Sequence, residues 1–293
     1  MIPPFSPNLL QDATDMLGYD FMRYAIVAGG CIALSAGLIG YFVVLRNQVF
    51  TSDALGHVAF TGGLGGLLAG LPLLGAVFGS TIAGAVVVGS LGGRARGRDV
   101  AIGTVFAWVL GVGVLCLSLY TTARSGAGGI VGISVLFGSM LSLQPGQAAT
   151  ASGAGVATSL ALIAICRPLL LASVDPDVAA ARGVPVTLLN LLFLALVGAT
   201  VAEAVQAVGA LLIFALMVTP AAIAQNLTAR PYLGLTLSAA LAVGFVWAGL
   251  AVAFYVPYPP SFFITAVAFA AYLASVAGTR LGRPRRAGGA PAG

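Results

Sequence analysis

Asp53 and His57 are the residues of this chain whose types and spacing best fit metal chemistry, and His57 is its single histidine. They are four positions apart, so on a helix their side chains lie on the same face, one turn from each other. A carboxylate and an imidazole at this spacing can bind one divalent cation. A structural interpretation is equally open at this point, because an aspartate paired with a core histidine can also hold a helix in place.

The composition predicts an all-α, polytopic integral membrane protein. Hydrophobic residues make up 59% of the chain, charged residues make up 7%, and the mean hydropathy is +1.06. A soluble core cannot absorb this much apolar surface. The formal charge of +5 comes mainly from loops and the C-terminal tail, so it indicates membrane topology and gives no sign of nucleic-acid binding. Asp53 and His57 then lie at membrane depth, where ionisable groups are costly and usually functional.

The basic residues exclude one class of function. Every basic residue is an arginine, and a phosphate-binding P-loop requires a lysine. If ATP drives this protein, another chain binds it. The three cysteines, Cys31, Cys116 and Cys166, lie in apolar stretches at unrelated spacings, so we expect neither a disulfide framework nor a cysteine-based metal site.

Runs of about 20 apolar residues predict nine membrane spans, or eight if the glycine-rich second run does not cross fully. The predicted spans are 21–45, 49–71, 73–92, 100–120, 150–172, 186–205, 207–227, 235–256 and 261–280. They form one permease-like domain, 21–282, between an extracytoplasmic N-terminal segment, 1–20, and a disordered cytoplasmic tail, 283–293. Most arginines follow the first, third, fifth, seventh and ninth spans, which places these connections in the cytoplasm.

Two connections are longer than turns. The first, 121–147, contains a short apolar piece at 135–140 that predicts an outer half-helix or re-entrant segment. The second, 173–185, has Asp175 as a possible N-cap, Pro176 at the first helical position and Gly183 near its end. This pattern predicts a short capped helix on the cytoplasmic side, with an ordinary interfacial linker as the alternative.

Glu203 is the other carboxylate within a predicted span. The predicted topology places it near the outer end of that span, where it either reaches water or attracts or coordinates a cation. His57, by contrast, lies about 12 Å from the cytoplasmic edge at 1.5 Å per residue. The glycines that follow it would let another helix, or a passing ion, approach its backbone.

Five stretches in order along the chain resemble the ABC-3 family of metal-ion permeases, the membrane subunits of bacterial zinc, manganese and iron importers. They are VVLR at 43–46, SDALGH at 52–57, FGSML at 137–141, DPD through GVP at 175–185, and QAVGALL through VTPAA at 206–222. The resemblance covers roughly residues 21–280. Gly56 departs from it, because the family usually has a serine there, and this removes a hydroxyl beside the proposed site.

The resemblance implies a type II-like ATP-driven importer in a bacterial plasma membrane. Such an importer contains two permease subunits, identical or different, two cytoplasmic ATPase subunits and an external metal-binding protein. The permease is not an enzyme and has no permanently bound cofactor, because the metal is its cargo. Family roles carry over as metal passage for Asp53 and His57, and as ATPase coupling for the cytoplasmic segment: Asp175, Pro176, Asp177, Ala181, Arg182, Gly183 and Pro185.

Two rival functions stay open. A secondary metal transporter would need a coupling-ion site and usually has inverted repeats with broken helices, whereas the sequence offers one charged intramembrane cluster. A permease for iron–siderophore or cobalamin-type ligands needs a wide chamber and gains little from an Asp–His pair. One histidine and one aspartate per subunit suit zinc if two subunits complete the site, and an oxygen-rich site with waters suits manganese.

Overall fold

The computed structural model describes residues 14–90, 95–123, 138, 140–256 and 258–281. Within these ranges the chain is helical and contains no strand, as the composition predicts. The helices are α2 (Asp20–Leu45), α3 (Val49–Leu68), α4 (Leu73–Ser90), α5 (Ala95–Ala123), η1 (Met140–Ser142), α7 (Pro145–Val174), α8 (Pro176–Ala181), α9 (Val186–Ala207), α10 (Ala210–Leu227), α11 (Pro231–Tyr255) and α12 (Pro260–Leu281).

Each of the predicted spans coincides with one of the long helices in the described part of the chain. Length and hydropathy together identify six of them as candidate spans, namely α2, α5, α7, α9, α11 and α12. The apolar stretches of α4 and α10 are shorter, Leu73–Gly89 and Leu212–Leu227. The choice between eight and nine crossings therefore stays a prediction. The proposed tail at 283–293, and most of the proposed N-terminal segment, lie outside the described residues.

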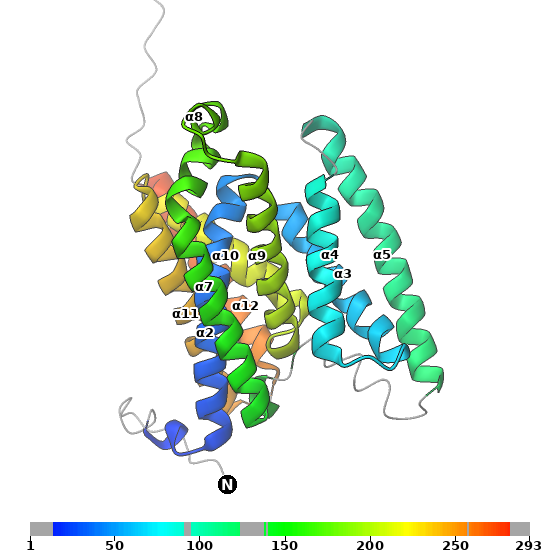
Figure 1. The fold of residues 1–293 in the computed structure, drawn as a ribbon. Helices are drawn as coiled ribbons and strands as arrows, with labels where there is room; N and C mark the ends of the chain where they lie inside the picture. Colours follow the sequence, from blue (N-terminus) through cyan, green and yellow to red (C-terminus); the bar gives the residue numbers. More distant parts are fainter. Residues whose placement is uncertain (1–13, 91–94, 124–137, 139, 257, 282–293) are drawn as a thin grey trace, which may run out of the picture.

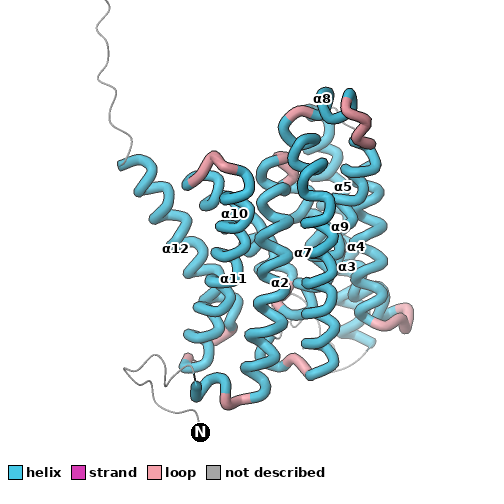
Figure 2. The backbone as a smooth tube through the Cα atoms, turned by 60° about the vertical axis from the view of Figure 1, so that its left-hand side comes forward, coloured by secondary structure: helices cyan, strands magenta, loops and turns pink. Residues whose placement is uncertain are grey.

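The long helices run alternately up and down, and α2 lies at the centre of the bundle (Figures 1 and 2). It packs against α7, α9, α10 and α11. Small residues permit this close packing. A Cβ on Gly37 would lie 2.8 Å from Ala239 Cα of α11, and a Cβ on Gly40 would overlap the Met217 backbone of α10. Ser238 Oγ of α11 also donates a hydrogen bond to the Gly37 carbonyl at 2.7 Å.

A tight turn connects α2 to α3 and sets where α3 begins. Asn47 adopts the left-handed backbone conformation, with φ of 52°. The Gln48 N–H donates to the Val43 carbonyl at 2.8 Å, and the Asn47 N–H donates to the Val44 carbonyl at 3.1 Å. This pattern ends α2 as a Schellman motif with asparagine in the position that glycine usually occupies. Helix α3 starts immediately afterwards, on the same end of the bundle as α8 (Figure 1).

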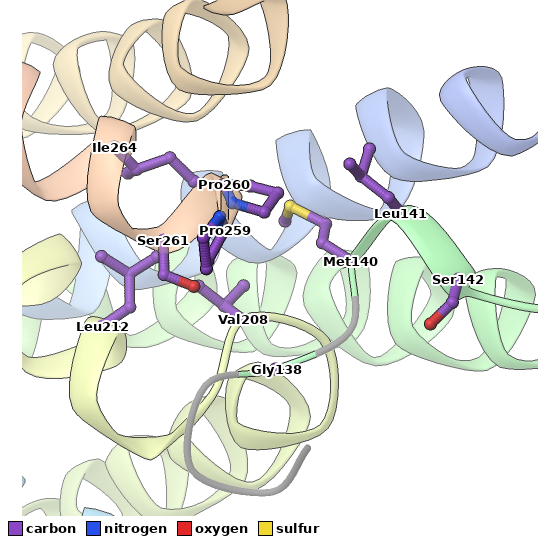
Figure 3. A pocket seen from close by; sticks show the side chains of 10 residues that line it. All are labelled: Gly138, Met140, Leu141, Ser142, Val208, Leu212, Pro259, Pro260, Ser261 and Ile264. Carbon is purple, nitrogen blue, oxygen red and sulfur yellow. The ribbon is translucent and has the colours of Figure 1, made fainter. Parts of the chain in front are cut away.

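The turn between α9 and α10 lies well inside the bundle, short of the ends of α2 and α7 (Figure 1). Beside it is a cavity of about 220 Å³, lined by the turn residue Val208, the start of α12 and the segment around η1 (Figure 3). Met140 of η1 is buried and faces Gly29, nine residues into α2. The expected half-helix at 135–140 lies mostly outside the described residues. Gly138 and Met140 are the described residues of this stretch, and they contact Val208 and Gly29 inside the bundle.

Candidate functional site

Helix α3 brings Asp53 and His57 together, one turn apart, near the end of the bundle that carries α8. His57 Nε2 lies 4.0 Å from Asp53 Oδ1, and the side chains are 19% and 37% exposed. The imidazole packs edge-on against the ring of Phe106 in α5, with 4.7 Å between ring centroids. Its Nδ1 is buried and makes no hydrogen bond within the described residues. Nε2 is therefore the ring nitrogen that can bind a metal together with Asp53, and the contact with Phe106 restricts rotation of the imidazole.

The Asp53–His57 pair can bind a divalent cation after a small side-chain movement. At metal–ligand distances of about 2.1 Å, two ligands at tetrahedral or octahedral angles lie about 3.0–3.4 Å apart. The present 4.0 Å separation exceeds this by less than 1 Å, which rotation of the carboxylate can supply. Two ligands leave the coordination incomplete. No group of three histidine, cysteine, aspartate or glutamate side chains that could hold a metal occurs among the described residues.

The glycines that follow His57 serve helix packing. A Cβ on Gly62 would overlap Ser80 of α4, and a Cβ on Gly66 would overlap Ala76 of the same helix. We expected these glycines to admit either another helix or a passing ion, and the structure shows close approach by another helix, α4. Because the glycines face α4, the Asp53–His57 pair lies on the opposite side of α3.

Glu203 is separate from the Asp53–His57 pair and is only 2% exposed. Thr158 of α7 donates a hydrogen bond to Glu203 Oε1 at 2.9 Å. Glu203 Oε2 and the carbonyl oxygen of Cys31 in α2 both lie beside Gly155 of α7, 3.1 and 2.8 Å from the position that a Cβ would take there. Cys31 is eleven residues into α2, which corresponds to about 16 Å of helix. The expectation that Glu203 reaches water at the outer end is therefore wrong for this chain, because the α9–α10 turn is recessed.

The predicted cytoplasmic segment forms the short capped helix α8. The Asp175 carboxylate accepts a hydrogen bond from the Val178 N–H at 2.9 Å, and Pro176 occupies the first turn. Gly183 adopts a φ of 79°, and Pro185 is the residue before α9. Most of this segment is exposed at one end of the bundle (Figure 2), including Asp177, Ala181 and Arg182. The predicted capped helix is therefore present, and its role as a docking element or as an interfacial linker stays a prediction.

Sequence reasoning missed two residues of these sites, Phe106 and Thr158. The contact between Phe106 and His57 joins α3 to α5 across a long sequence separation, and no local pattern predicts it. Thr158 had a detectable signal, because Gly155, Thr158 and Ser159 are small residues at helical spacing on one face of α7. Such a face predicts a close helix partner, although it does not identify Glu203 as that partner.

Comparisons with known proteins match almost the whole chain. The model of the ABC 3 transport family matches residues 18–279. The manganese transport system membrane protein MntC of Halalkalibacterium halodurans is 30% identical over 245 residues, which cover 83% of this chain and 82% of that protein. The manganese import system permease protein ScaB of Streptococcus parasanguinis is 29% identical over 207 residues, with 70% and 72% covered. The structure of PsaBC from Streptococcus pneumoniae with Fab superimposes with a TM-score of 0.79 at 23% identity, covering 92% and 95%.

Proposed function

Because this chain belongs to the ABC 3 transport family, we propose that it forms the membrane path through which an ABC importer moves a divalent metal ion into a bacterial cell. The chain is a multi-pass protein of the plasma membrane and is a transport subunit, not an enzyme. ATP hydrolysis takes place on a separate chain, which agrees with the absence of lysine and hence of a P-loop. Residues 21–282 are proposed as the permease domain.

The observation that carries this proposal is the Asp53–His57 pair on α3. It combines one hard oxygen donor with one imidazole, a set that suits manganese, zinc or iron. Manganese is the first candidate, because the relatives MntC and ScaB bear that metal in their names. An ion in transit has to be released again, so a pair of ligands completed by waters suits passage better than a closed site does.

The missing ligands indicate a second permease subunit. Asp53 is 37% exposed, so a neighbouring chain can reach the cation that it binds. If two copies meet about a two-fold axis, each contributes the same pair and the two copies together provide four ligands. The helix α8, with Asp175, Arg182 and its neighbours, is the proposed docking element for the ATPase. The opposite end of the bundle would receive an external metal-binding protein.

The two rival functions make different demands on the site. A carrier of siderophores or cobalamin would not require Asp53 and His57, because its ligand encloses the metal. A secondary transporter would take up metal without ATP and without a second protein on α8. A measurement of metal uptake, with and without ATP, therefore separates the proposed importer from both rivals.

The test is ATP-dependent uptake of radioactive manganese and zinc by vesicles that contain the assembled transporter. We expect His57→Gln and Asp53→Asn each to lower uptake by more than about tenfold, since even ligand-supporting contacts are worth 10–100-fold in metal affinity. These variants keep the size of the side chains and their hydrogen-bonding capacity, but not the metal ligand or the charge. Near wild-type uptake by both variants, at equal amounts of complex, would falsify the proposed path.

A further inference from the structure

The imidazole of His57 lacks the hydrogen bond that usually orients a metal-binding histidine. In most metal sites, the ring nitrogen away from the metal donates a hydrogen bond to a carboxylate, a carbonyl or a water. This bond fixes the orientation of the ring and makes it a stronger ligand. In this chain that nitrogen is Nδ1, because Nε2 faces Asp53, and Nδ1 is buried without a hydrogen-bond partner in the described residues. Another contact must therefore orient the ring if the pair is to bind a metal.

Phe106 of α5 makes such a contact with His57. The two rings lie edge to face, with an interplanar angle of 89° and 4.7 Å between their centroids. This is one of the preferred geometries of aromatic pairs, and it depends on how each ring is turned. The contact therefore favours one orientation of the imidazole, and hence one direction for Nε2.

A hydrogen bond between α3 and α5 sets where the Phe106 ring lies relative to His57. Thr61 Oγ1 of α3 donates to the Val109 carbonyl of α5 at 2.9 Å. Thr61 is four residues after His57, and Val109 is three residues after Phe106, so this bond lies one turn beyond the ring contact on both helices. It links a side chain of one helix to the main chain of the other, and so it restricts sliding of α5 along α3. The position of the Phe106 ring is therefore a property of the helix packing.

Phe106 also borders a cavity of about 210 Å³ between α3, α4 and α5. Its lining includes Leu55 and Val58 of α3, Val88 of α4 and Val109 of α5, and every lining residue is apolar. The cavity therefore offers the imidazole no hydrogen-bond partner. A smaller side chain at position 106 would enlarge this empty space, because surrounding structure closes a void only in part.

We infer that Phe106 is a positioning residue of the metal site, whose ring orients His57 in place of the missing hydrogen bond. The inference rests on the proposed role of the Asp53–His57 pair in metal passage. A ring contact orients the imidazole but, unlike a carboxylate partner, does not make it a stronger ligand. The site thus combines a defined geometry with weak binding, which suits an ion that has to be released.

The test is the Kd of the assembled transporter for Mn²⁺ without nucleotide, measured from the loss of the EPR signal of free Mn²⁺. Phe106→Leu keeps an apolar side chain beside His57 but removes the ring. We expect the Kd to rise by about 2–12-fold, the factor that corresponds to what an aromatic pair contributes beyond its buried area. His57→Gln defines the site, because the Mn²⁺ that this variant fails to bind is the Mn²⁺ held by the pair.

Phe60 provides the matched control. It lies on α3, is 3% exposed, and packs against α5, where a Cβ on Gly113 would lie 3.1 Å from Phe60 Cδ1. Phe60→Leu therefore removes a ring from the same pair of helices but leaves the Phe106 ring in place. Because Phe106 is only half-buried, Phe60→Leu should lower the Tm at least as much as Phe106→Leu does. It should nevertheless leave the Kd for Mn²⁺ unchanged.

The outcomes separate this inference from the proposed function. An unchanged Kd in Phe106→Leu, together with lost binding in His57→Gln, would overturn the role of Phe106 and leave the metal path intact. Equal rises of the Kd in Phe106→Leu and Phe60→Leu would also overturn it, because general packing would then explain both. Native binding of Mn²⁺ by His57→Gln would instead overturn the proposed function itself.

Discussion

Helix α8 can be disrupted by one substitution at an exposed position, and this gives the sharpest test of the coupling segment. Its six residues are held by the Asp175 cap, and a cap of this kind contributes about 1 kcal/mol. Ala180→Pro removes one backbone N–H and forces the ring against the carbonyl of Pro176, at a cost of about 3 kcal/mol or more. This cost exceeds the cap's contribution, so α8 should unfold. Ala180 is exposed and Ala179 is the buried residue of this helix, so most of the packing between α7 and α9 should be preserved.

The measurement is ATPase activity of the assembled complex, with and without the metal-loaded binding protein, together with metal uptake. We expect Ala180→Pro to retain membrane insertion but to lose stimulation and uptake. Ala180→Ser is the control, because it costs only about 0.5 kcal/mol of helix propensity at the same exposed position. Arg182→Glu leaves the helix intact and tests the charge alone. If the proline variant is stimulated as strongly as the serine variant, α8 is not the coupling element.

Two further predictions concern topology and packing. The first uses a chain whose three native cysteines are replaced. Tyr232 is the second residue of α11 and Tyr258 lies three residues beyond the end of that helix, and both are exposed. Tyr232→Cys should therefore react with an impermeant thiol reagent only from the cytoplasmic side, and Tyr258→Cys only from outside. Labelling of both from one side would refute the arginine-based orientation. Gly40→Ala should lower the free energy of unfolding by about 1–3 kcal/mol, because its Cβ meets the Met217 backbone. Gly244→Ala, where a Cβ has open space, should be neutral or stabilising by up to about 1 kcal/mol, and equal effects of the two substitutions on thermal unfolding would contradict the packing argument.

Local patterns predicted the long helices and the short capped helix α8 well. Apolar run length determines where a helix can cross a membrane, and each predicted run coincides with a helix. The caps of α8 were also predictable, because Asp175, Pro176 and Gly183 each favour one backbone position near a helix end. The Asp53–His57 pair needed only the helical repeat, since its geometry lies within one turn.

The depth of Glu203 could not be predicted in the same way. Hydropathy locates a helix along the chain but does not place its end relative to neighbouring helices. Glu203 is four residues from the end of α9, and that end is recessed, so a position that looks peripheral in sequence is central in the bundle. Its partners Thr158 and Gly155 are on α7, some 45 residues earlier, as the Thr158 hydrogen bond shows. The contact of Phe106 with His57 is non-local for the same reason.

The different surroundings of the two carboxylates favour Asp53 over Glu203 as a ligand on the proposed ion path. Asp53 lies on the side of α3 away from its glycine contacts with α4 and remains 37% exposed, so its site is open to a neighbouring subunit and to a passing ion. Glu203 is enclosed by α2, α7 and α9 and is 2% exposed, so a passing ion would reach it only if those helices separated. Transport requires ligands that release their ion readily, and the open, incomplete pair on α3 meets this requirement. The enclosed carboxylate does not meet it, so we expect Glu203 to contribute less to metal passage than Asp53 does.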